Sequence, residues 1–349
     1  MLFRSSTLQV AYDTEVVEHA CRAIAESARD PRPLLLVASF THPHDPYEVP
    51  AGYWERYEGV EIDAPVWPDP PEPIDAPTRR LRAMVAAERI PVSQDQALLA
   101  RRGYYGAIAL VDDHVGTILS ALAEHGLAGD TVVVVTSDHG DMLGERGLWY
   151  KMAPFEDSIR VPLIVHAPGR FAAAWVARPV SLLDLVSTLL DLAGGFEPAA
   201  PVDGVSLVPA LSGDALPTGD VPLEYLAEGV RAPQVTLVRG PLKLVRELGE
   251  PPLLYDVERD PGERVNLADE PGSSDEAYAL LETVTARWDL ERLDDEVRAS
   301  QERRRLVARA LATGERTIWD HPTDNPAGPY IRSGDDFWRT LEAARRPSQ

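Results

Sequence analysis

A short, strongly apolar run constrains the fold of this chain more than any other feature. Residues 131–137 read TVVVVTS, four consecutive valines that stop abruptly at Asp138-His139-Gly140. A bounded run of this length rich in β-branched residues is typical of a strand in a sheet that is covered on both faces. Two similar runs, at 33–41 and 161–168, predict two more buried strands.

The segments between these runs have a different period. Residues 13–29 carry apolar positions at helical spacing behind an aspartate, which predicts an amphipathic helix starting at Asp13. Residues 97–125 predict one long helix or a kinked pair, and 180–194 a further amphipathic helix. Strands alternating with helices predict an α/β domain, with a mixed central sheet flanked by helices. The proline-rich stretch 60–78 predicts a surface excursion.

The pattern changes near residue 215. Two short apolar segments, VTLVRGPLKLVREL and PPLLYDVERDPGERVNL, predict a small antiparallel sheet, and a charged helix is expected over about 275–312. The last stretch is irregular and rich in aromatic residues and proline. We therefore expect a partial α/β domain at 1–215, a smaller C-terminal subdomain with an antiparallel sheet and a helix at 216–312, and an irregular tail at 313–349.

Charge and cysteine content narrow the functional classes. The net charge is −22, which repels phosphate backbones and argues against nucleic-acid binding. The single cysteine excludes internal disulfides and a thiolate zinc cluster. No apolar run approaches the length of a bilayer span and no leader opens the chain, so we expect a cytoplasmic protein without membrane contact.

The Asp138–His139 pair is the first candidate site. In open α/β sheets, ligands bind beyond the carboxyl ends of the strands, where this pair lies. A carboxylate and an imidazole suit a divalent cation, although Ser137 or Asp138 could equally cap a following helix. Lys151 is one of only two lysines against thirty-two arginines. It could serve as a cation for a tetrahedral oxyanion or be an ordinary surface lysine.

A second histidine site follows the run at 33–41, in the sequence THPHDPY. His44 lies between two prolines, which fix the backbone direction. Such a histidine suits a hydrogen-bond donor to an anion or a general acid, although an ordinary loop histidine remains the alternative. His42 is the weaker candidate, and Asp45 could orient a histidine ring or cap a turn.

These motifs, in this order, resemble the sulfatase family of the alkaline-phosphatase-like superfamily. The resemblance covers about residues 33–270 and is carried by SFTHPHDPY, by VVVVTSDHGDMLGERGLWYK with its flanks, by VSLLDLVSTLLDLAG, by DGVSLVPALSG and by LYDVERDPGERVNLA. Within the family, SFTHPHDPY and the segment SQERRRLVARAL are most similar to choline-sulfatases. The resemblance implies an alkaline-phosphatase/sulfatase-like fold that is N-terminally incomplete here, with a sulfate monoester as the small-molecule substrate.

Carried over by position, the resemblance implies particular roles. Asp138 and His139 match ligands of a Ca²⁺ or Mg²⁺/Mn²⁺ ion, Lys151 matches the lysine that contacts the sulfate, and His44 matches the histidine of the family's PHxP motif. The family nucleophile is a formylglycine hydrate made from the Cys or Ser of a C-x-P-x-R motif. The metal, lysine and histidine spread the developing negative charge.

The nucleophile of that mechanism has no counterpart in this sequence. Cys21 lies in HACRAIAE, without the proline or arginine of the motif, and we expect it to be a small buried helix residue. No Asp-Asp pair at a strand end precedes residue 33, and Asp112-Asp113 lies within a helical stretch. We therefore expect no turnover by this chain alone, and an open, apolar sheet edge that favours association.

Two alternatives remain open at this point. The same superfamily includes phosphonate monoester and phosphodiester hydrolases, and a degenerate sulfatase-like chain could act as a non-catalytic binding subunit. A choline headgroup would prefer carboxylates and aromatic faces, for which Glu228 and the tail acids Asp335 and Asp336 are weak candidates. The aromatic tail also predicts a homo-oligomer.

Overall fold

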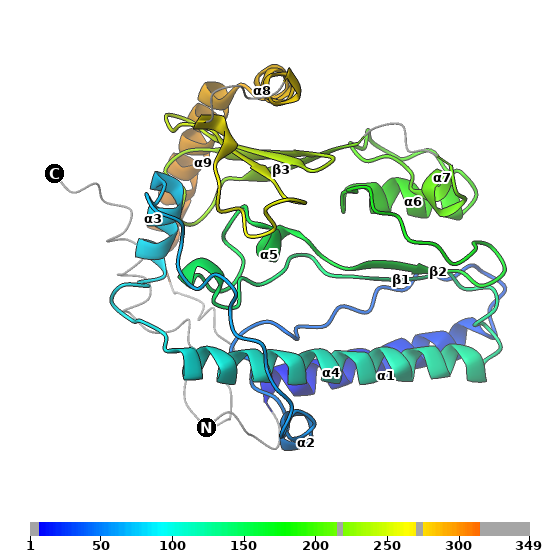
Figure 1. Ribbon diagram of the computed structural model, residues 1–349. Coiled ribbons are helices and arrows are strands. Elements are labelled where there is room, and N and C mark those ends of the chain that lie inside the picture. Colours follow the sequence, from blue (N-terminus) through cyan, green and yellow to red (C-terminus); the bar gives the residue numbers. More distant parts are fainter. Residues whose placement is uncertain (1–6, 215–218, 270–274, 315–349) are drawn as a thin grey trace.

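The computed structural model describes residues 7–214, 219–269 and 275–314, and it arranges them in layers (Figure 1). The long helices α1 and α4 form one outer layer, the strands β1 and β2 lie above it, and a second sheet with helix α8 lies on the far side. This mixed α/β architecture confirms the expected fold class.

The helical layer is a pair of packed helices with a short third helix beside it. α1 spans Leu8–Ser27, α2 Ala51–Glu55 and α4 Gln94–Glu124. α4 is a single unbroken helix that begins with a capping box, in which the side chains of Ser93 and Gln96 bind each other's backbone N–H groups. Ile24 of α1 packs against Ala121 and Leu122 of α4.

The start of α1 corrects one prediction. The helix begins five residues before Asp13, with Thr7 as its N-cap accepting a hydrogen bond from the Val10 N–H at 3.2 Å. Asp13 instead lies inside the helix and is completely buried. Among the described residues, α4 is also long and apolar enough to cross a membrane, by length and composition alone, which the sequence analysis did not anticipate.

Two of the three predicted strands of the α/β layer form. β1 (Val133–Thr136) and β2 (Leu163–His166) pair antiparallel, with Val133 opposite His166. The predicted strand at 33–41 is wrong as a buried strand: it is extended but has no paired strand among the described residues, and Leu35 and Val37 are 77% and 79% exposed. An apolar run forms a buried strand only where neighbours pair with its edges and cover its faces.

The connections of the α/β layer contain short helices. These are α3 (Ala76–Met84), the 3₁₀ turn η1 (Glu145–Gly147), α5 (Glu156–Ile159), α6 (Asp184–Leu192) and α7 (Val208–Leu211). Figure 1 shows α6 and α7 on one side of the β1–β2 layer and α4 with α1 on the other. The proline-rich stretch before α3 has no regular structure, as predicted.

The predicted C-terminal antiparallel sheet is present. It is a meander of β3 (Asp220–Tyr225), β4 (Gln234–Arg239), β5 (Leu242–Glu247) and β6 (Leu253–Asp256), followed by the turn η2 (Leu267–Asp269). The charged helix is two helices, α8 (Asp275–Arg287) and α9 (Leu290–Leu311), separated where Asp289 caps α9 by accepting from the Arg292 N–H.

The meander is covered on both faces. On one face, Val235, Leu237 and Leu244 pack against Leu280 and Val284 of α8. On the other face, Val245 and Tyr255 pack against a cluster that includes residues of α3 and of the loop between β1 and α5. The C-terminal sheet therefore shares a core with the segment that carries Lys151.

Candidate functional site

The loop after β1 carries the Asp138–His139 pair. The next helical turn begins only at Glu145, so neither Ser137 nor Asp138 caps a helix, and the capping interpretation is wrong. Asp138 Oδ1 accepts from the His139 N–H at 3.0 Å, and its side chain is 84% exposed. The pair is thus presented to solvent at the strand end.

The orientation of the His139 ring is fixed by the backbone. Its Nδ1 lies 2.8 Å from Gly140 O, and only a protonated nitrogen can donate to a carbonyl oxygen. In the neutral ring the lone pair then lies on Nε2, and this atom is 3.5 Å from Asp138 Oδ2. A backbone carbonyl that fixes the ring in this way is the usual support of a metal-binding histidine.

Lys151 and His44, which are 107 residues apart, meet beside this pair. The Lys151 Nζ lies 3.0 Å from His44 Nε2, and the His44 and His139 rings approach edge to face with centroids 6.4 Å apart. The structure therefore brings all four core residues of the predicted site together: His44, Asp138, His139 and Lys151.

Asp45 and Lys151 shift the pKa of His44 in opposite directions. Its Nδ1 lies 2.9 Å from the Asp45 carboxylate and 3.0 Å from the Asp45 carbonyl oxygen. The hydrogen bond to Asp45 raises the pKa of His44, whereas burial and the positive charge of Lys151 oppose that rise. The imidazole can thus accept a proton at Nε2 while Asp45 stabilises the resulting cation.

The residues present do not by themselves complete a divalent metal site. Within the described ranges, no group of three or more His, Cys, Asp or Glu side chains is arranged to hold an ion. Asp138 and His139 offer two ligand atoms, whereas Ca²⁺ takes six to eight. The donors are of the right kind and His139 is correctly oriented, but their number is insufficient.

The short helix α5 holds both halves of the site. The Gly140 N–H donates to Ser158 O at 2.7 Å, and the Ser158 hydroxyl donates to Lys151 O. A Cβ on residue 140 would lie 2.1 Å from Asp157 O, so only glycine allows this approach. Sequence reasoning missed this contact, because a hydrogen bond between the backbone of a loop and that of a separate short helix leaves no periodic signal.

A half-buried carboxylate organises the loop between His139 and Lys151. Asp141 accepts from the Tyr47 hydroxyl at 2.6 Å and from the backbone N–H groups of Leu143 and Tyr150 at 3.0 Å each. Burial raises the pKa of Asp141, while these donors partly oppose the rise. Sequence reasoning did not single out Asp141, although its place two residues after the pair could have suggested a role.

The same loop is tied to the proline-rich stretch. The Glu145 carboxylate accepts from the backbone N–H groups of Val66 and Trp67 at 2.9 and 2.8 Å. In return, the Arg146 N–H donates to Trp67 O at 2.6 Å. The excursion predicted for 60–78 is therefore the support on which the site loop rests.

Helix α1 anchors the segment that carries His44. The Asp13 carboxylate accepts from the Thr41 N–H at 2.7 Å and from the His42 N–H at 3.1 Å, and it lies 2.6 Å from His42 Nδ1. His42 is itself buried. His42 is thus a structural residue, and Asp13 was missed because the pattern marked it as the start of the helix.

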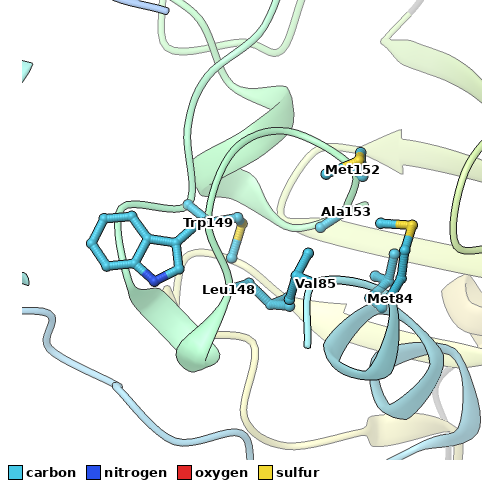
Figure 2. Close-up of a pocket in the computed structure, with 8 residues that line it drawn as sticks. Met84, Val85, Leu148, Trp149, Met152 and Ala153 are labelled. Atoms are coloured by element: carbon cyan, nitrogen blue, oxygen red, sulfur yellow. The ribbon is translucent and has the colours of Figure 1, made fainter. Parts of the chain in front are cut away.

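A small apolar cavity lies between α3 and the loop that follows β1 (Figure 2). Its volume is about 10 Å³, which leaves room for one water molecule and not for a substrate. In Figure 2, Met152 and Ala153 face Met84 of α3, whereas the Trp149 indole extends away from them. The cavity is a small packing defect between α3 and the loop that carries Lys151.

The remaining predicted residues lie elsewhere. Glu228 is exposed at the turn after β3, and no contact joins it to the four core residues in the described structure. Asp335 and Asp336 lie outside the described residues. Cys21 is partly buried against the α1–α4 core, and Asp113 binds Tyr53 and Arg56 from within α4.

Family models match three parts of the sequence. The sulfatase model matches residues 4–195, the model of the choline sulfatase enzyme C terminal matches 295–346, and the model of the N-sulphoglucosamine sulphohydrolase C-terminal region matches 144–288. The first of these contains all four core site residues.

Curated relatives agree with these models. The chain is 39% identical to a choline-sulfatase from Rhizobium meliloti (strain 1021), over 97% of this chain and 68% of the relative. It is 32% identical to an arylsulfatase from Clostridium perfringens, over 51% of this chain and 38% of the relative.

Solved structures share the fold. A phosphonate monoester hydrolase from Silicibacter pomeroyi matches with a TM-score of 0.66 and 26% identity, covering 78% of this chain and 59% of that one. A putative sulfatase from Bacteroides thetaiotaomicron matches with a TM-score of 0.64 and 25% identity, covering 84% of this chain and 66% of that one. The chain spans less than two thirds of either structure. With more than half of its residues matched by the sulfatase model, and with its identity to a choline-sulfatase extending over nearly its whole length, the chain belongs to the sulfatase family.

Proposed function

We propose that this chain supplies the oxyanion-binding part of a sulfatase that acts on sulfate monoesters of the choline-sulfate type. The observation that carries the proposal is the 3.0 Å contact between Lys151 Nζ and His44 Nε2, beside His139. The identity to a choline-sulfatase over 97% of the chain and the match to the choline sulfatase C-terminal model support the substrate class.

The two cationic groups have complementary roles. The Lys151 ammonium binds the non-reacting oxygens of a sulfate group that inserts between it and His44. His44 carries a proton on Nε2 when it is imidazolium, a state that Asp45 stabilises, and it donates that proton to the departing alcohol oxygen. Asp138 and His139 are the ligands that this chain offers to a divalent cation, which would supply further charge stabilisation when bound.

The nucleophile is the part of the reaction for which this chain offers no residue. Its one cysteine, Cys21, lies in α1 without a C-x-P-x-R motif, and burial raises the pKa of its thiol. A raised thiol pKa disfavours the reactive thiolate. We therefore propose that the 349-residue chain binds the sulfate group but does not turn the ester over by itself.

The test separates binding from turnover. Lys151 and Lys243 are the only lysines, and Lys243 is fully buried, so an amine-acetylating reagent followed by peptide mass spectrometry reports on Lys151 with an internal control. Inorganic sulfate should slow Lys151 acetylation about tenfold at ten times its dissociation constant. Choline chloride should not, and His44→Ala should weaken the protection.

Turnover is measured on the same preparation. Incubation with choline sulfate should release no sulfate above the buffer control. Release at an enzymatic rate would contradict the proposed lack of turnover. Unprotected Lys151 would contradict the oxyanion site and favour a non-catalytic binding subunit.

A second candidate, a phosphonate monoester hydrolase, is favoured by the structural likeness to that enzyme from Silicibacter pomeroyi. The same acetylation assay discriminates between the two. If methylphosphonate protects Lys151 at a lower concentration than sulfate does, the phosphonate assignment is preferred.

A further inference from the structure

Lys243 is the second lysine of the chain, and it is completely buried in β5. Its Nζ donates to Pro154 O at 2.9 Å and to Glu156 Oε1 at 3.1 Å, and it forms an ion pair with Glu263. A buried ammonium is costly unless it is paired and hydrogen-bonded, as it is here. Pro154 lies just before α5, Glu156 is the first residue of α5, and Glu263 lies on the turn after β6.

Glu263 connects the same segments through a second bond. Its Oε2 accepts from the Glu156 N–H at 2.8 Å, and the side chain is almost completely buried. Burial raises the pKa of Glu263, whereas the charge of Lys243 opposes the rise. The Arg146 guanidinium lies 3.8 Å from the centre of the Phe155 ring and donates to Gly262 O at 2.8 Å.

Lys243, Glu263 and the Arg146 guanidinium each contact residues 154–156, where α5 begins. That segment leads directly into α5, where Ser158 O accepts from Gly140 and the Ser158 hydroxyl binds Lys151 O. A continuous path of hydrogen bonds therefore runs from the C-terminal sheet, through α5, to the residue after His139 and to the backbone of Lys151. No member of the path except Lys151 belongs to the oxyanion site.

We propose that Lys243 and Glu263 are positioning residues that fix α5 and thereby hold His139 and Lys151 at the separation the oxyanion site requires. The effect on sulfate binding rests on the proposed function. The fixing of α5 by Lys243 and Glu263 can be tested without substrate. The C-terminal subdomain would then act as a template, meaning that it fixes the positions of the loops that carry His139 and Lys151.

Amide hydrogen exchange of the purified chain provides the test. In Lys243→Met, the Gly140 N–H should exchange about tenfold faster relative to the amides of α4, because its acceptor on α5 is no longer held in place. Arg239→Met is the matched control: Arg239 lies in the same sheet and pairs with Asp220 at 2.6 Å, far from α5 in the bonding path. It should leave the Gly140-to-α4 ratio unchanged.

A charge-neutral double variant distinguishes positioning from loss of folding. Lys243→Met leaves Glu263 buried without its cation, whereas adding Glu263→Gln removes that charge and retains an oxygen for the Glu156 N–H. The double variant should restore part of the Gly140 protection, and if Lys243→Met alone does not fold, the comparison is made between Glu263→Gln and the double variant. An unchanged Gly140-to-α4 ratio in all of these variants overturns the proposal.

The sulfate-protection assay is then repeated on the same variants. If Gly140 exchange rises and sulfate protection of Lys151 weakens in Lys243→Met, the template acts on the oxyanion site. If sulfate never protects Lys151, even in the unaltered chain, the proposed function is wrong. The hydrogen-exchange result then still decides whether Lys243 and Glu263 fix α5.

Discussion

The strands β1 and β4 are both short and rich in valine, yet they lie in opposite surroundings. The first five residues of β4 are buried, and Leu237 is only 1% exposed. No residue of β1 is fully buried, and Thr136 is exposed, although its sequence is the more apolar of the two. Its partner β2 alternates between half-buried and exposed positions, with Ile164 on the exposed side.

The difference lies in what surrounds each strand. β4 has a paired strand on both edges, α8 on one face and the α3 and site-loop cluster beyond the other face of its sheet. β1 has β2 on one edge, and no strand in the described parts of the chain pairs with the other edge. The apolar character of a run shows that it needs covering, but its neighbours determine whether it is covered.

In the α/β layer, carboxylates that are buried or half-buried connect separate parts of the chain, in addition to the apolar clusters around Ile24 and Val49. Asp13 and Glu145 accept from backbone N–H groups of distant segments, and Asp141 accepts from the Tyr47 hydroxyl. The C-terminal sheet relies on apolar side chains. The two regions should therefore respond differently to the removal of apolar groups and to pH.

The largest effect is expected in the C-terminal core. Leu237→Ala should lower the free energy of unfolding by about 2–5 kcal/mol, because it removes packing against α8 and leaves a cavity. Urea unfolding followed by circular dichroism measures the change. A cost below about 1 kcal/mol would show that this core is less tightly packed than its burial indicates.

An intermediate, pH-dependent effect is expected at Asp13. Asp13→Asn should cost about 1–3 kcal/mol near neutral pH, because a buried acceptor of several hydrogen bonds is weakened. Burial raises the pKa of Asp13, but the hydrogen bonds from His42 and Thr41 outweigh it and hold the pKa below its ordinary value.

The sign of the pH dependence follows from that lowered pKa. The stabilisation by ionised Asp13 is fully present above the ordinary pKa of about 3.9 and is lost as the pH falls through the lower folded value. Urea unfolding of both proteins from pH 7 to pH 3 should show a constant difference down to about pH 4 and a smaller one below. A difference that grows on acidification would contradict this assignment.

The smallest effect is expected in the exposed segment. Leu35→Ala should change the free energy of unfolding by no more than about 0.5 kcal/mol, because its side chain is mostly exposed. It is the matched control for Leu237→Ala. A cost comparable to that of the core variant would show that this segment is covered in solution, and sedimentation at several protein concentrations would then identify association of copies as the cause.

Local sequence patterns predicted which helices and strands form better than they predicted what surrounds each of them. The helices near 13–29, 97–125 and 180–194 and the antiparallel meander are present, because hydrophobic period is a property of the segment itself. The burial of 33–41 and the position of Asp13 were wrong, because both depend on what lies beside them. Similarly, the break in the charged C-terminal helix depends on a single capping side chain, Asp289.

The residues of the candidate site show the same difference between what a local pattern predicts and what depends on neighbours. His44, Asp138, His139 and Lys151 were recognisable from their motifs and from the ends of apolar runs. The supporting contacts through Ser158, Glu145 and Lys243 were not, because each joins residues that are distant in sequence and bind backbone atoms. Backbone donors and acceptors carry no sequence signature.

The bond between Glu145 and the backbone of residues 66 and 67 has a consequence for protein engineering. The loop from Asp138 to Lys151 owes its shape to a partner that precedes it by some eighty residues, and a Cβ at Gly147 would lie 2.3 Å from Arg82 Nη1 and 3.3 Å from Pro68 O. Grafting this loop alone onto another α/β scaffold would transfer its side chains without their arrangement. A functional graft would have to include the proline-rich stretch as a second, discontinuous piece.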